Sequence, residues 1–216
     1  MKTYRLMISC AASCVWLNAL NGYALSDPAE TLRQNNRAAL DSWVGSRMES
    51  SSIHIVPKVV PIAEQSVREV FPKYDFYGVY MPRWPRAITP PEGLSYETIG
   101  VLCAGEFVGA IRGDEELKAF VAKNLTEVTS ETGARRAAEA ALILVSYCSS
   151  NGPFQLKEPV LSAVRESKGI LVTAQAEVHE PARGDIKVTL EFDATGRTSP
   201  GAITIASAAR AQPPPR

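Results

Sequence analysis

The chain has 216 residues, of which 45% are hydrophobic and 21% are charged. This composition excludes a disordered chain and is typical of one globular domain of ordinary size or two small ones. The 23 basic residues balance the 23 acidic residues. Because a protein binds a phosphate backbone through a basic surface, this balance argues against a nucleic-acid partner.

The first 24 residues have the layout of a secretory signal peptide. Lys2 and Arg5 form a positive start, Leu6–Leu20 is uncharged and mostly apolar, and small residues precede a cleavage site after Ala24. The alternative is an uncleaved anchor, but a membrane span needs about 20 apolar residues and this segment is shorter. We therefore expect a secreted or periplasmic protein with no stable membrane span after cleavage. It would keep 21 basic and 23 acidic residues, a net charge of −2.

Two cysteines remain after cleavage, Cys103 and Cys148. In an oxidising compartment, a single pair is most simply a disulfide. Such a bond would close a loop of about 45 residues. The loss of chain entropy in the unfolded state would then stabilise the fold by ~4 kcal/mol at most. The alternative is two buried free thiols, because free cysteine is among the most buried residue types.

The mature sequence begins with a predicted helix from Asp27 to about Met48, which has apolar residues at helical spacing and a capping pattern at its start. Residues 53–61 are β-branched but contain two prolines, so they predict extended chain or an edge strand. A short helix over residues 62–70 follows and ends before Pro72.

The centre of the predicted fold is a hairpin with strands over Glu97–Cys103 and Glu106–Ile111. An aromatic strand over Tyr74–Met81 precedes it. Two helices follow, one that opens at Asp114 and one over Ala134–Tyr147, whose slim alanine-rich face allows close packing.

The last third of the chain changes to a period of two, which predicts half-buried strands with one wet face. These strands cover residues 170–179, 186–193 and 202–206. Residues 160–165 predict a further strand, and a helix after Pro159 is the competing interpretation. The proline-rich end, residues 210–216, predicts a disordered tail.

These elements predict the α+β class, with one antiparallel sheet, the hairpin plus the C-terminal meander, packed by the N-terminal and central helices. Residues 25–209 would form a single domain. A break near residues 149–153 leaves open two lobes, each with its own sheet. Helices that precede a meander of strands resemble the cone-shaped folds of the nuclear transport factor 2 and cystatin types, in element order and without a shared motif.

No motif for a nucleophile elbow, a phosphate loop, a dinucleotide fold or a zinc protease is present. The chain has only two histidines, His54 and His179, and their scatter with the cysteines gives no metal-ligand spacing. We therefore expect no metal site and no cofactor. These absences leave the question of an enzyme open, although the sequence favours a protein without catalysis.

The first functional hypothesis is a non-catalytic interaction or binding module with an unknown protein or small-molecule partner. Its candidate contact surface combines Arg83, Trp84 and Arg86 with the neighbouring Tyr77 and Tyr80. The alternative for Trp84 is a lid that folds back on the sheet, with the arginine stems beside it.

The second hypothesis is a small-ligand binder or enzyme with a pocket between a curved sheet and its helices. Its candidate residues are His179, Glu177 and Glu191, which we expect side by side on the wet face of the meander. Neighbouring carboxylates would raise the pKa of the histidine and suit it to proton transfer. The alternative is that His179 is simply a solvated strand residue.

Overall fold

The computed structural model describes residues 28–49, 57–80, 97–148, 155–178, 182–207 and 210–211. The predicted signal peptide, residues 1–24, lies outside the described residues. Along the chain the elements are α1 (Pro28–Glu49), β1 (Lys58–Ile62), α2 (Gln65–Val70), β2 (Asp75–Tyr80), β3 (Glu97–Cys103), β4 (Glu106–Ile111), α3 (Asp114–Asn124), α4 (Glu131–Cys148), β5 (Val160–Glu166), β6 (Gly169–Val178), β7 (Ala182–Asp193), a single 3-10 turn (Pro200–Ala202), β8 (Ile203–Ser207) and β9 (Arg210–Ala211).

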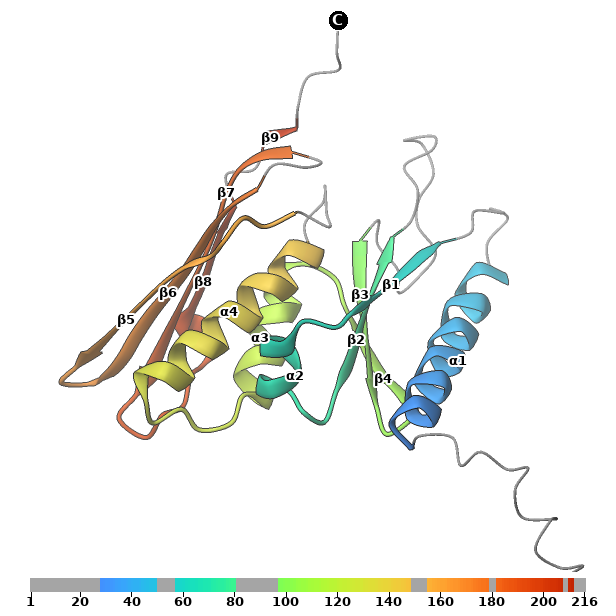
Figure 1. The fold of residues 1–216 in the computed structure, drawn as a ribbon, viewed down its shortest axis with the longest axis horizontal. Coiled ribbons are helices and arrows are strands. Elements are labelled where there is room, and N and C mark those ends of the chain that lie inside the picture. Colours follow the sequence, from blue (N-terminus) through green and yellow to red (C-terminus); the bar gives the residue numbers. More distant parts are fainter. Residues whose placement is uncertain are drawn as a thin grey trace, which may run out of the picture.

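These elements form four layers, which Figure 1 shows from right to left. Helix α1 covers the outer face of a first sheet, made of β1–β4. Helices α2, α3 and α4 lie between this sheet and a second sheet, made of β5–β9. The α+β class is therefore correct, but the single sheet that we predicted is wrong, because the hairpin and the C-terminal meander belong to separate sheets.

Each sheet is an antiparallel meander, with strand orders β1-β2-β3-β4 and β5-β6-β7-β8, and the short β9 also pairs with β7. Residues 160–166 form a strand, as predicted, and not the competing helix. Arg210 and Ala211 form β9, so the residues that we assigned to a disordered tail begin with a paired strand.

Helix α4 is the central element, because it packs between the two sheets. It is buried on most of its circumference, largely through alanines, whose small side chains let neighbouring elements approach closely. Its core is shared: Phe76 and Val101 of the first sheet belong to the same buried cluster as Val172 and Leu190 of the second. The two sheets are thus joined through one hydrophobic core.

Helix α1 packs on the other face of the first sheet through a smaller core. Trp43 stacks on Phe107 of β4, with ring centroids 4.3 Å apart. Leu40 is fully buried and lies over Gly100, where a Cβ atom would be 2.6 Å from the leucine Cδ1. Gly100 therefore permits the close approach of helix and strand. A hydrogen bond from buried Asn36 to Asp75 links α1 to β2.

Candidate functional site

The structure does not bring the predicted contact surface together. Arg83, Trp84 and Arg86 lie outside the described residues. Tyr77 and Tyr80 are described, but they are only 6% and 8% exposed. Tyr77 packs in the core under α1, whereas the ring of Tyr80 lies 6.5 Å from that of Tyr147 on the opposite face of the sheet. Helices cover both faces of this sheet, so neither tyrosine forms an exposed contact surface.

The predicted disulfide is absent, because Cys103 and Cys148 are not bonded to each other. Cys148 follows Tyr147, which lies beside Tyr80 at the end of the sheet where β3 begins with Glu97. Cys103 lies six residues further along β3, which is about 20 Å of extended chain. A disulfide needs its two Cα atoms within about 7 Å, so these two cysteines cannot bond in this fold.

The carboxylates of the predicted proton-transfer site are far from each other. Glu177 and Glu191 are both on the second sheet, as expected, but Glu177 pairs with Asp185 and Glu191 pairs with Leu171. Leu171 and Glu177 are six residue steps apart along β6, which separates the two glutamates by about 20 Å. His179 lies outside the described residues. Glu191 lies at the opposite end of β6 from the residue that precedes His179 in the chain.

No described helix covers the face of the second sheet opposite α4, which we call the uncovered face. Alternation along the strands defines it, because residues of the other parity are buried against α4. Its residues are Val160, Ser162 and Val164 of β5, Leu171, Thr173, Gln175 and Glu177 of β6, Asp185, Lys187, Thr189 and Glu191 of β7, and Thr204 and Ala206 of β8.

A row of hydroxyl side chains crosses the middle of the uncovered face. Ser162, Thr173, Thr189 and Thr204 are successive cross-strand partners on β5, β6, β7 and β8. The hydroxyls of Thr173 and Thr189 lie 3.3 Å apart and form a hydrogen bond. This row is therefore polar but uncharged, and the charged residues of the face lie on either side of it, with Lys187 in the next row.

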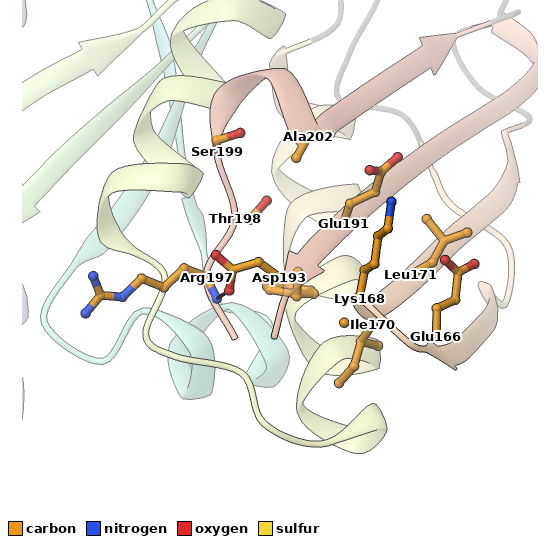
Figure 2. A pocket seen from close by; sticks show the side chains of 12 residues that line it. Glu166, Lys168, Ile170, Leu171, Glu191, Asp193, Arg197, Thr198, Ser199 and Ala202 are labelled. Atoms are coloured by element: carbon orange, nitrogen blue, oxygen red, sulfur yellow. Dashed lines mark hydrogen bonds between the residues drawn. The ribbon is translucent and has the colours of Figure 1, made fainter. Parts of the chain in front are cut away.

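A cavity of about 580 Å³, which we call the turn-end cavity, lies at one end of this face, beside the segment that connects β7 to β8. Figure 2 shows Glu166, Lys168 and Glu191 on the strand side of this turn-end cavity and Thr198 and Ser199 on the other side. It is lined by Glu166, Lys168, Gly169, Ile170, Leu171, Glu191, Phe192, Asp193, Arg197, Thr198, Ser199 and Ala202.

Two charged residues of the turn-end cavity have structural partners. The Asp193 carboxylate accepts hydrogen bonds from the backbone and hydroxyl of Thr195 and from the backbone N–H of Arg197. The Thr195 hydroxyl is the largest cause that lowers the pKa of Asp193, followed by the bond from Arg197. The Arg197 guanidinium binds Glu127, with Nη2 2.8 Å from Oε1. Both residues therefore hold the turn rather than a ligand.

Other polar groups of the cavity have no partner among the described residues. Glu166, Lys168 and Glu191 form no ion pair there, and the Thr198 hydroxyl oxygen is buried without a hydrogen bond in the part of the chain that the structure describes. A buried hydroxyl without a partner costs free energy. That oxygen is closed to a ligand as it is to water, so the groups that the cavity offers to a small polar molecule are the side chains of Glu166, Lys168 and Glu191.

A second hollow, of about 520 Å³, lies at the other end of the uncovered face. Lys157, Glu177 and Asp185 are among the residues that line it. The Lys157 ammonium lies 3.1 Å from a carboxylate oxygen of Glu177, and both side chains are more than half exposed. Such an exposed pair contributes little free energy of binding or folding.

The edge of the second sheet exposes apolar side chains. Strand β5 is the last strand of its meander, so one of its sides has no strand partner in the described structure. Val160 is 72% exposed and Val164 is 54% exposed, and both are on the uncovered face. The sequence predicted a strand over these residues but gave no sign that it would be an edge strand, because strand order is not encoded in local alternation.

Among the described residues, no group of three or more histidine, cysteine, aspartate or glutamate side chains could hold a metal ion. No described helix is long and apolar enough to cross a membrane.

Comparisons with known proteins give no match. No family model, no curated protein and no solved structure is significantly similar to this chain.

Proposed function

We propose that the protein is a non-catalytic interaction module, secreted or periplasmic, which binds an extended protein strand along the free edge of its second sheet. The observation that carries the proposal is the pair of exposed valines, Val160 and Val164, on β5, whose outer side has no strand partner among the described residues. A strand added there would satisfy the unpaired backbone groups of β5 and cover both valines.

The centre of β5 lacks the features that protect sheet edges. Edge strands commonly carry lysine, proline or inward-pointing charges, which discourage pairing with another chain. Strand β1, an edge of the first sheet, has both Lys58 and Pro61. Residues 160–164 of β5 are Val, Leu, Ser, Ala and Val, without a charge or a proline. This difference favours β5 over β1 as an edge that pairs with a partner.

The proposal is tested with a photoreactive amino acid in place of Ser162, which lies between the two valines. The protein is made in its own host, irradiated, and its adducts are identified by mass spectrometry. We expect one defined protein adduct that disappears with Val160→Glu and Val164→Glu together, because charged side chains on an edge strand oppose pairing with another strand. The mass of the chain also tests export, since a mature chain would begin at Leu25.

The matched control is Val108→Glu. Val108 is 56% exposed and is on β4, an edge of the other sheet, so it should not affect the adduct. Absence of any adduct, or an adduct that survives the double substitution on β5, would show that this edge does not bind a protein strand.

The second candidate function is binding of a small polar ligand. This function would hold for an enzyme and for a protein without catalysis. Glu191 and Lys168 favour it, because both line the turn-end cavity and form no ion pair with another described residue. A co-purified ligand, detected as extra mass in native spectra, should be lost with Glu191→Gln but kept with Glu177→Gln, about 20 Å away. If His179→Ala changes neither binding nor turnover, a catalytic role of His179 is excluded.

A further inference from the structure

We infer that the partner of β5 is a second copy of this chain, paired antiparallel about Ser162. The inference rests on the proposed function, because it names the strand that occupies the same edge. It would join the two second sheets into one continuous sheet across a twofold axis.

The sequence of β5 is complementary to itself in this register. An antiparallel pair centred on Ser162 places Val160 of one copy opposite Val164 of the other, twice by symmetry. Leu161 then lies opposite Ala163 on the face toward α4, where the same alternation puts both residues. Cross-strand pairs of β-branched residues stabilise a sheet, so every residue from 160 to 164 gains an uncharged partner of suitable size.

The charged residues of the strand lie outside this central pairing. Arg165 already donates to the backbone carbonyl oxygen of Thr129, 2.8 Å away, and Glu166 is the last residue of β5. Residues 160–164 carry no charge, so none is buried when the two strands meet. This removes the main electrostatic cost of the pairing.

The position of α4 leaves room for the same helix of the second copy. Helix α4 contacts β5, β6 and β7 and so is centred near β6. With a spacing of about 4.8 Å between strands, the two β6 strands of the joined sheet would be about 14 Å apart. Packed helices need about 8–10 Å between their axes, so the two α4 helices would fit on the same side of the sheet.

The first measurement is sedimentation equilibrium of the protein purified from its own host, at up to about 100 µM, where a dimer of micromolar affinity is largely formed. We expect twice the chain mass. Val160→Glu with Val164→Glu should give the single chain mass, whereas Val108→Glu should leave the dimer intact. A dimer that survives the double substitution would overturn the inference, because another surface would hold it.

The second measurement tests the register through disulfide formation. Under mild oxidation, Ser162→Cys should give a covalent dimer, because the two cysteines face each other across the axis. Val160→Cys and Val164→Cys should each remain unlinked, yet a mixture of these two variants should link. The natural protein, oxidised in parallel, shows the background from Cys103 and Cys148. Failure of Ser162→Cys to link would overturn this register.

These results separate the two proposals. A protein of single chain mass that still gives a valine-dependent adduct with a different protein would overturn the self-pairing and leave the proposed function standing. A protein of single chain mass without any adduct at Ser162 would overturn both.

Discussion

Tyr147 has a strongly raised pKa in the folded protein. Its hydroxyl donates a hydrogen bond to Glu64 Oε1 at 3.1 Å, and its ring lies beside Tyr80. Burial is the largest cause that raises the pKa of Tyr147, the charge of Glu64 is the next, and together with the hydrogen bond they raise it to about 12. The folded protein therefore holds this phenol in its neutral form.

This pair predicts a loss of stability in strong alkali. The pKa of Tyr147 is about 12 in the folded state and 10.0 without the fold, so its contribution is complete below pH 10 and is lost between pH 10 and 12. We expect Tyr147→Phe to be less stable than the natural protein at pH 7, because Glu64 loses a donor. Its free energy of unfolding should fall less between pH 10 and 12.

Denaturant titrations at each pH measure this difference. The matched control is Tyr74→Phe, which removes a hydroxyl that donates to neutral Asn124 Oδ1 at 2.8 Å and should retain the alkaline loss of the natural protein. Equal alkaline slopes for the natural protein and Tyr147→Phe would contradict the assignment.

The residue types alone could not show whether the two cysteines form a disulfide or whether the two glutamates lie close together. Two cysteines in a mature chain suggest a bond, but the positions of Cys103 and Cys148 at opposite ends of the first sheet depend on where α4 packs. Glu177 and Glu191 share a face because each alternates with buried apolar residues along its own strand. The distance between them depends on the register of β6 with β7. Parity follows from sequence, but register requires the tertiary structure.

At the scale of elements, local patterns predicted most helices and strands. The bounds of β3 and β4 match those predicted, because two alternating runs flank Ala104 and Gly105, which both adopt positive φ in the turn. Helix α4 begins at Glu131, three residues before the predicted start. This places Arg135 and Arg136 in the second turn, where they pair with Glu131 and Glu69.

The number of sheets could not be predicted in the same way. Alternation shows which side chains of a strand are buried, but not which strand lies next to it, so hairpin and meander could equally form one sheet or two. The signal that we missed is in α4. Ala134, Ala137, Ala138, Ala140 and Ala141 are all buried around the helix. A helix that is apolar on most sides lies between two layers, whereas a helix on one sheet needs a single stripe.

At the scale of the molecule, the shared core means that the two sheets should unfold together. Buried residues of both sheets and of α4 belong to one cluster, so damage to α4 removes contacts from each sheet. Cooperative unfolding is usual when one core serves the whole chain. Two independent lobes, each with a core of its own, would instead lose their structure at different denaturant concentrations.

Ala138→Leu tests this coupling. Ala138 is 0% exposed, so the larger side chain would overpack the core and should lower the free energy of unfolding by about 1–3 kcal/mol. The control is Ala119→Leu, on the exposed side of α3, which should change stability by less than about 0.5 kcal/mol. Amide hydrogen exchange in mild denaturant, read on peptides from β2–β3 and from β6–β7, should show equal losses of protection in Ala138→Leu. A loss confined to one sheet would mean that α4 belongs energetically to that sheet alone, and that the other has a separate core.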